Sequence, residues 1–372
     1  MKNLNYGFVG FGLIGGSIAR NLRYLCPTSK IIAYNYNPAN TNPNLLLAKE
    51  EGTLSKIVTS FEDGFPECDV IFLCAPVLRN ISYLSSLKKV IKKSCIITDV
   101  GSVKSSIHDA VHEEGLDANF IGGHPMAGSE KTGYENSTRQ LLENAYYVLT
   151  PTEQTPNSHI EIMEHLVSEI GAIPVILDPH NHDDIVAAIS HVPHIIAASL
   201  VNMVKDTDDE QSHMHSLAAG GFKDITRIAS SSPVMWENIC LTNDSSITRF
   251  IDTYISYLTQ MKQAIEEKDS EYLINFFQNS KDYRDTIPNK AVGVISSVYD
   301  LHIDVDDKKG AIATIATILA SHDINMKNIR ILHNREDIGG ALCIDFNDEV
   351  SRNRAYQVLS SYNYRIHDIE DQ

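Results

Sequence analysis

Three glycines near the start of the chain have a spacing that could hold an anionic ligand. Gly10, Gly12 and Gly15 follow a strand-like apolar run and precede a helical pattern, which is the context that the GxGxxG motif requires. In such a loop the first glycine permits a tight turn, the second lets the backbone approach a pyrophosphate, and the third allows close helix packing. Amide groups at Leu13 and Ile14 would lie at the positive end of the helix dipole. The loop is therefore predicted to bind a dinucleotide.

The second strand-like run ends at Asn35, where a dinucleotide-binding fold usually has an acidic residue that holds the ribose hydroxyls. An asparagine can still hydrogen-bond the ribose, but it lacks the negative charge that would exclude a 2′-phosphate. No arginine stands beside it, since Tyr36, Asn37 and Pro38 follow. We therefore expect NAD as the cofactor, with NADP as the open alternative.

Polar residues follow three later strand-like runs, at the points where these runs end. The three segments are Cys74–Pro76, Asp99–Lys104 and Gly122–Glu130. In a doubly wound sheet the carboxyl ends of the strands meet at one edge, where substrate chemistry gathers. Ser102 and His124 lie in the second and third segments, so both are candidates for chemistry at this edge.

Histidine pairs elsewhere have spacings that would suit paired metal ligands. These pairs are His108 with His112, His180 with His182, and His213 with His215. A convincing third and fourth ligand is missing for each pair, so no metal site is predicted. The 6 cysteines include no CxxC pair, which argues against a disulfide framework or a thiolate zinc site and favours small buried side chains.

The elements that must position these residues fall into three predicted domains. Over residues 1–178 short apolar runs alternate with helical patterns, which predicts a doubly wound parallel sheet of the Rossmann type. Residues 179–288 are helical nearly throughout, with Pro193 expected to kink one helix. Residues 289–372 follow the order strand, helix, two strands, helix, strand, which predicts a ferredoxin-like βαββαβ module. Because the middle helices are strongly apolar, we expect them to pack against a second subunit in a homodimer.

Composition narrows the classes of partner. The formal net charge of −17 would repel a phosphate backbone, and no Lys/Arg cluster creates a basic face, so nucleic acid is not expected. Hydrophobic residues make up 43% and charged residues 21%, as in ordinary globular proteins. Neither a signal peptide nor an apolar stretch of about 18 residues was found, which predicts a cytoplasmic protein without a membrane span.

Five segments in order resemble the prephenate dehydrogenase family. Three of them are the strand-end segments above, and the other two are His191–His194 and Gly221–Arg227. No segment is specific alone, but their combination is, and the resemblance covers essentially the whole chain. It implies an NAD-dependent oxidative decarboxylation of prephenate to 4-hydroxyphenylpyruvate in tyrosine biosynthesis.

The resemblance also implies roles for single residues. His124 would be the catalytic histidine that hydrogen-bonds the ring hydroxyl of the substrate, and Ser102 would orient that hydroxyl or His124. An ordinary histidine pKa of about 6.5 agrees, because an alcohol must lose a proton as it becomes a carbonyl. Arg227 would anchor a carboxylate of the dianionic substrate with its planar fork. In second rank, substrate binding or gating is implied for His191, Lys223 and Glu130, and Trp236 is a candidate for a pocket wall.

The last segment resembles an ACT domain, a module that commonly pairs side by side and binds an amino acid at the shared edge. Tyrosine is the effector that this resemblance implies, with contacts at Gly310 and Asn325. Many ACT loops have a proline before the glycine, whereas this chain has Lys309, which weakens the effector assignment but not the fold. A purely structural, oligomerising module is the alternative.

Other interpretations stay open. Core packing explains His191 as well as a ligand contact does, and a surface salt bridge would explain Arg227. An arogenate or cyclohexadienyl dehydrogenase is the nearest alternative, because arogenate differs from prephenate only in its side-chain amine. A two-domain hydroxyacid dehydrogenase is a further alternative, as is a non-catalytic sensor of a dinucleotide and an amino acid. The joint presence of His124, Ser102 and Arg227 argues against the sensor.

Overall fold

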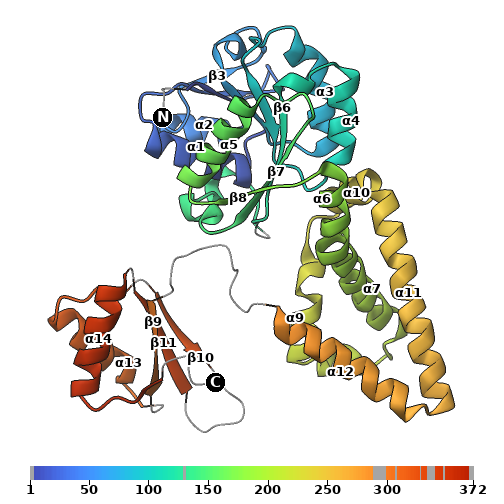
Figure 1. The fold of residues 1–372 in the computed structure, drawn as a ribbon, viewed down its shortest axis with the longest axis vertical. Helices are drawn as coiled ribbons and strands as arrows, with labels where there is room; N and C mark the ends of the chain where they lie inside the picture. Colours follow the sequence, from blue (N-terminus) through green and yellow to red (C-terminus); the bar gives the residue numbers. More distant parts are fainter. Residues whose placement is uncertain are drawn as a thin grey trace. The chain divides into compact units, whose positions relative to one another are not determined.

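The computed structural model describes residues 4–128, 131–287, 299–305, 308–326, 328–332, 340–346 and 348–367. The chain divides into two compact units, 1–288 and 289–372 (Figure 1). The first unit contains an eight-stranded sheet with its helices and a group of further helices. The second contains a four-stranded sheet with two helices.

The eight-stranded sheet has the order β3-β2-β1-β4-β5-β6-β7-β8. Its strands are β1 Tyr6–Val9, β2 Ile31–Tyr34, β3 Lys56–Val58, β4 Val70–Leu73, β5 Ile96–Asp99, β6 Phe120–Pro125, β7 Tyr146–Pro151 and β8 Ile173–Ile176. The predicted parallel, doubly wound sheet is confirmed from β3 to β6, but β7 runs antiparallel to β6. The β6–β7 connection contains two short 3-10 turns, Tyr134–Asn136 and Arg139–Leu142, instead of the long helical crossover that parallel neighbours need.

Helices cover both faces of this sheet (Figure 1). They are α1 Leu13–Leu25, α2 Pro43–Glu50, α3 Val77–Lys88, α4 Ser105–Glu113 and α5 Asn157–Glu169. Successive strand residues point to opposite faces, so Phe8 packs in the core beneath α1 and α5 while Val9 packs in the core beneath α3 and α4. Burial on both faces explains why the strands are apolar at nearly every position.

The helical part of the first unit begins directly after β8. Its helices are α6 Pro179–Val186, α7 Val192–Thr207, α8 His213–Leu217, α9 Gly220–Thr226, α10 Pro233–Thr242, α11 Asp244–Glu267 and α12 Ser270–Thr286. A π-helical turn, Ala187–His191, joins α6 to α7. Pro193 lies in the first turn of α7, where its missing N–H breaks no regular helix bond, so the expected kink takes the form of this π turn. Val103 from the sheet side packs into the core of the helical part.

The segment Pro179–Thr207 is long and apolar enough to span a membrane by length and composition alone. Residues 185–204 contain no Asp, Glu, Lys or Arg, but His191, His194 and Asn202 interrupt the run, so it is not an uninterrupted apolar stretch. Core helices pass the same test, and this segment carries three buried polar side chains that contact the rest of the unit, His182, Asp183 and His191. Part of this segment is therefore buried by packing within the unit.

The second unit has the predicted βαββαβ order. Its elements are β9 Tyr299–Val305, α13 Ala311–Ser321, β10 Asn328–Leu332, β11 Gly340–Phe346, α14 Glu349–Ser361 and β12 Ile366–His367. The antiparallel sheet has the order β10-β11-β9-β12. Leu301, Ile303 and Ile344 from the strands pack with Leu319 and Leu359 from the two helices. The apolar core therefore lies between the helices and one face of the sheet.

Candidate active site

The glycine-rich loop joins β1 to α1 and has room for a ligand. Gly10 has φ +90°, and a Cβ atom there would lie 2.6 Å from the backbone of Cys74 and Ala75, so a side chain does not fit. A Cβ atom at Gly12 would meet no protein atom within 4 Å. The Gly12 backbone is thus open to an incoming group at the amino end of α1, where Leu13 and Ile14 begin the helix. This arrangement fits the pyrophosphate of a dinucleotide.

Asn35 follows β2 and is buried, and its side chain organises the loop behind it. The Nδ2 atom donates to the carbonyl oxygen of Asn37 at 2.6 Å, and Oδ1 accepts from the amide of Asn42 at 3.3 Å. Gly15 lies close to Cys74 at the end of β4, because an ideal Cβ atom at Gly15 would be 3.1 Å from the Cβ atom of Cys74. A contact between Asn35 and ribose remains a prediction, and it would have to coexist with these hydrogen bonds and with a third, from Nδ2 to the carbonyl oxygen of Asn40 at 3.4 Å.

His124 lies near the end of β6 and is hydrogen-bonded to a second histidine. Its Nδ1 atom is 2.8 Å from Nε2 of His182 on α6, and Nδ1 of His182 is 2.8 Å from Oδ1 of Asp183. The Asp183 carboxylate also accepts from the backbone amides of Lys104 and Ser105, each at 2.7 Å. A chain of hydrogen bonds therefore runs from His124 through His182 to a carboxylate fixed by the start of α4.

The carboxylate determines the direction of these hydrogen bonds. Hydrogen bonds from His182 and Ser105 lower the pKa of Asp183 against the opposing effect of burial, so Asp183 is ionised and accepts only. The Nδ1–H of His182 must then donate to it, and a neutral His182 accepts at Nε2 from Nδ1–H of His124. The lone pair of His124 is left on Nε2. Burial, reinforced by the nearby His182, holds the pKa of His124 well below its ordinary value, so this lone pair is available at neutral pH.

A buried ion pair supports the backbone on both sides of this site. Lys104 and Asp99 are both fully buried; the Lys104 ammonium pairs with the Asp99 carboxylate and donates to the carbonyl oxygen of Gly123 at 2.7 Å. Asp99 also accepts from the amides of Gly101 at 2.8 Å and Gly123 at 3.1 Å. The same pair thus fixes the loop that carries Ser102 and the strand residue before His124.

A second pair of histidines lies on the π turn and α7. His191 is buried, and its Nδ1 accepts at 3.2 Å from Nδ2 of Asn243, which also donates to the Asp183 carbonyl at 2.9 Å. Burial lowers the pKa of His191 to about 4, so His191 is a neutral donor through Nε2–H at neutral pH. The ring of His194 lies 4.0 Å from the ring of Trp236. Burial is the main cause of the lowered pKa of His194, and the positive charge of Arg227 adds to it, which places Arg227 near this histidine.

The predicted site residues differ in their surroundings. His124 and His191 are linked through the shared network of Asp183, and Arg227 lies near His194, while Ser102 occupies the loop after β5. Lys223 is exposed on α9. Glu130 lies outside the described residues. Gly310 and Asn325 belong to the second unit, where both are exposed.

Sequence reasoning missed the residues that hold His124 in place. The sequence places His182 in a histidine pair with metal-ligand spacing, near the substrate-side loop, but gives it no link to His124, and it does not single out Lys104, Asp183 and Asn243. One signal was present for Lys104, because a lysine five residues after the aspartate that ends a buried strand is a candidate for a buried pair. No sequence pattern connects His124 with His182, since their contact arises from the tertiary packing that places α6 beside α4.

Comparisons with known proteins cover most of the chain. Residues 18–176 match the family model described as prephenate dehydrogenase, nucleotide-binding domain, and residues 178–279 match prephenate dehydrogenase, dimerization domain. A prephenate dehydrogenase of Bacillus subtilis (strain 168) is 38% identical over 355 residues, which are 95% of this chain and 94% of the relative.

Two solved structures resemble the first unit. One is prephenate dehydrogenase from A. aeolicus in complex with hydroxyphenyl propionate and NAD+, with 30% identity, a TM-score of 0.72 and coverage of 77% of this chain and 99% of that one. The other is Synechocystis arogenate dehydrogenase, with 27% identity, a TM-score of 0.67 and coverage of 77% and 100%.

Proposed function

The chain belongs to the prephenate dehydrogenase family, and from this premise we infer what each residue around His124 does. The reaction is the NAD-dependent oxidative decarboxylation of prephenate to 4-hydroxyphenylpyruvate. The assignment of residues rests on one observation. A chain of hydrogen bonds from His124 through His182 to Asp183 leaves a lone pair on Nε2 of His124. A base in this form is what the oxidation of a ring alcohol requires.

The loop at Gly10, Gly12 and Gly15 would hold the pyrophosphate of NAD, with amides of Leu13 and Ile14 directed at its charges. When bound, NAD supplies the acceptor for the hydride that leaves the ring carbon. Asn35 would face the ribose, and its neutral amide fits NAD without excluding NADP.

His124 would accept the hydroxyl proton of the substrate at Nε2 as the ring carbon loses its hydride. When His124 is protonated, its Nδ1–H donates to His182. The Asp183 carboxylate, which accepts from His182, then stabilises the positive charge of the imidazolium through this chain of hydrogen bonds. The ring carbon is then a ketone, which accepts the electron pair of the bond to the leaving carboxylate. Carbon dioxide departs, the ring becomes aromatic, and the oxygen takes its proton back from His124. Ser102 would orient the hydroxyl or the imidazole.

The substrate is a dianion and needs cationic or hydrogen-bonding anchors. Arg227, near His194, would bind one carboxylate with its planar fork, and Lys223 adds positive charge on the preceding turns of α9. His191 offers a neutral Nε2–H. Trp236 has a buried Nε1–H with no hydrogen-bond partner within the described part of the chain, which makes it a further donor for the substrate. Glu130 is retained as a gating candidate on the family resemblance.

We further propose a homodimer in the cytoplasm. The match of residues 178–279 to a dimerization domain supports the dimer, as do large exposed apolar side chains on this part. They include Leu217, Leu241, Ile255, Leu258, Ile274 and Phe277. The 6 cysteines are free thiols, which is typical of a reducing compartment.

Tyrosine is the proposed effector of the second unit. Gly310 has φ +88° and caps the amino end of α13, and a Cβ atom there would meet nothing within 4 Å. Asn325 in the same module is also exposed, so the module offers open backbone and amide groups to an amino acid. The family resemblance of this segment to an ACT domain supports the assignment.

The test is turnover by the purified full chain. Prephenate and NAD should give reduced nicotinamide and 4-hydroxyphenylpyruvate in equal amounts, and His124→Asn should lower kcat by about 10²- to 10⁴-fold while NAD binding persists. Arogenate, NADP and added tyrosine form further arms. Turnover of arogenate alone would change the substrate but keep the mechanism. Absence of turnover with all four pairs, in protein that binds the dinucleotide, would contradict the assignment.

A further inference from the structure

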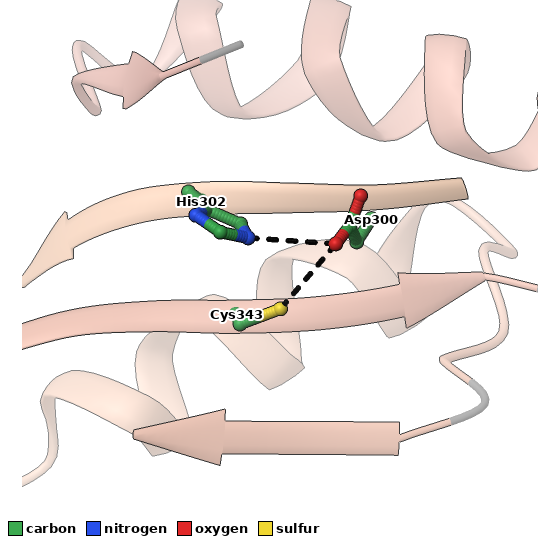
Figure 2. A group of neighbouring side chains, drawn as sticks. All are labelled: Asp300, His302 and Cys343. Atoms are coloured by element: carbon green, nitrogen blue, oxygen red, sulfur yellow. Dashed lines mark hydrogen bonds and ion pairs between the residues drawn. The ribbon is translucent and has the colours of Figure 1, made fainter. Parts of the chain in front are cut away.

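Four ionisable side chains form a quartet on the two central strands of the second unit. Asp300 and His302 lie on β9, and Cys343 and Asp345 lie on the neighbouring β11. The strand register pairs Asp300 with Asp345 and His302 with Cys343. Residues two apart along a strand share a face, so all four side chains stand on the face opposite the apolar core. Figure 2 shows Asp300, His302 and Cys343 converging there.

The distances between these side chains are close to the edges of a small coordination polyhedron. Nε2 of His302 is 3.4 Å from Oδ2 of Asp300, and Sγ of Cys343 is 3.9 Å from that oxygen and 3.7 Å from Oδ1 of Asp345. Ligand atoms of Asp300, His302 and Cys343 all lie within 4.8 Å of one another. A tetrahedral zinc ion with bonds of about 2.0–2.3 Å separates its ligand atoms by about 3.3–3.8 Å.

Burial and charge also favour a cation at this position. Cys343 is only 1% exposed, and the side chains of His302 and Asp300 are 23% and 9% exposed. Two carboxylates, Asp300 and Asp345, stand directly opposite each other on adjacent strands, where like charges destabilise a sheet. A divalent ion between the strands would turn this repulsion into attraction.

We propose that Asp300, His302 and Cys343 bind a zinc ion, with Asp345 or water as the fourth ligand, and that this ion ties β9 to β11. The mixed sulfur, nitrogen and oxygen set suits zinc, whereas magnesium and calcium prefer oxygen ligands only. On binding, the thiol of Cys343 gives its proton to the solvent and coordinates as a thiolate. The cysteine pattern gave no hint of this site, because its ligands come from two strands that are far apart in the sequence.

The experiment is a titration of the chelator-treated full chain with Co²⁺, a probe that gives a thiolate charge-transfer band in the near ultraviolet. Wild-type protein should develop this band with one equivalent of Co²⁺, and Zn²⁺ should abolish it by competition. Cys343→Ser should remove the band, and His302→Gln should weaken Co²⁺ binding by 10-fold or more, as the loss of one ligand does. Two control variants should retain the band: Cys240→Ser, which removes a thiol in the first unit, and Asp304→Asn, which removes a carboxylate further along β9.

Two results would overturn the zinc site. A wild-type chain that gives no thiolate band with Co²⁺ decides the question without any variant, so failure of a variant to fold does not matter. A band that survives Cys343→Ser would assign the metal to another thiol. A supporting measurement is thermal unfolding, in which a given Zn²⁺ concentration should raise the melting temperature of wild type and of Asp304→Asn more than that of His302→Gln.

Discussion

His124 on β6 and His182 on α6 are joined ring to ring, Nδ1 to Nε2, at 2.8 Å, although they belong to different segments of the chain. His124 lies within the stretch that matches the nucleotide-binding model, and His182 within the stretch that matches the dimerization model. The helical part therefore completes the proposed acid–base group, whose first member lies on the sheet. Asp183, the next residue, anchors the contact by accepting two backbone amides at the start of α4.

This relationship predicts a role for His182 in positioning and tuning His124. Repulsion between the two rings when both carry a proton is one cause of the low pKa of His124, so His182→Gln should raise that pKa and move the acidic limb of kcat/KM to higher pH. It should also lower kcat by about 10- to 100-fold, because His124 loses a partner of fixed orientation. The pH profile of prephenate turnover measures both effects.

The matched control is His180→Gln, two residues earlier on α6. His180 is exposed, and its Nδ1 contacts the Ser105 hydroxyl at 3.1 Å instead of His124. This variant should keep the wild-type pH profile. An acidic limb that stays unchanged in His182→Gln would show that the histidine pair has no part in the proton transfer.

The glycine-rich loop offers a pair of substitutions with opposite outcomes. Gly12→Ala adds a methyl group that meets no protein atom within 4 Å, so the chain should keep its melting temperature while KM for NAD rises about 10-fold or more. Gly10→Ala forces a methyl group to within 2.6 Å of backbone atoms at φ +90°, so it should lower the melting temperature as well. Thermal unfolding and NAD titration distinguish the two. Unchanged NAD affinity in Gly12→Ala would place the pyrophosphate elsewhere.

Local patterns in the sequence predicted the elements well, because strand and helix periodicities reflect burial on one or two faces. The βαββαβ order and the parallel strands up to β6 followed from such patterns. The reversal of β7 did not, since the decisive feature is a connection without a long helix, and its polar residues resemble those of any loop. The π turn before Pro193 was also not predictable, because a proline indicates that a backbone hydrogen bond of the helix is lost but not which local conformation replaces it.

The sequence indicated candidate site residues only where they form a pattern that is local along the chain. The glycine loop and His124 stand out because strand ends and glycine spacings can be read along the chain. His182 and Asp183 were not recognised, since their importance comes from a contact across 58 residues of sequence. The zinc quartet has the same property, because strand register alone brings Cys343 beside Asp300.

Breaking the buried pair of Lys104 and Asp99 should strongly destabilise the first unit. Lys104→Met leaves the Asp99 carboxylate buried without its cation, which typically costs about 3–5 kcal/mol. Urea unfolding followed by the fluorescence of Trp236, the single tryptophan, reports on this unit. Lys281→Met breaks an exposed pair with Asp285 on α12 and should cost less than about 1 kcal/mol. Equal losses of unfolding free energy in the two variants would mean that breaking the buried Lys104–Asp99 pair costs no more than breaking an exposed pair.

Acid should destabilise the first unit partly through His108, a buried histidine outside the catalytic group. Burial, aided by the charge of Lys104, lowers the pKa of His108 to about 4, and its Nε2 lies 2.8 Å from the Thr150 hydroxyl. In the unfolded chain His108 is protonated as the pH falls through about 6.5, whereas in the folded chain it is protonated only near pH 4. The unfolded state therefore binds more protons in this window, and the free energy of unfolding falls as pH falls, by at most about 3 kcal/mol for this group.

His108→Gln removes this titration while an amide can still reach Thr150, so the free energy of unfolding should depend less on pH between 6.5 and 4 than in wild type. His191, with its pKa also near 4, keeps part of the slope in the variant. His112→Gln, one turn further along α4, is the control, because the His112 side chain is 76% exposed and is solvated in both states. Urea unfolding at a series of pH values measures the slopes. If His108→Gln and His112→Gln flatten the dependence equally, burial of His108 is not the cause.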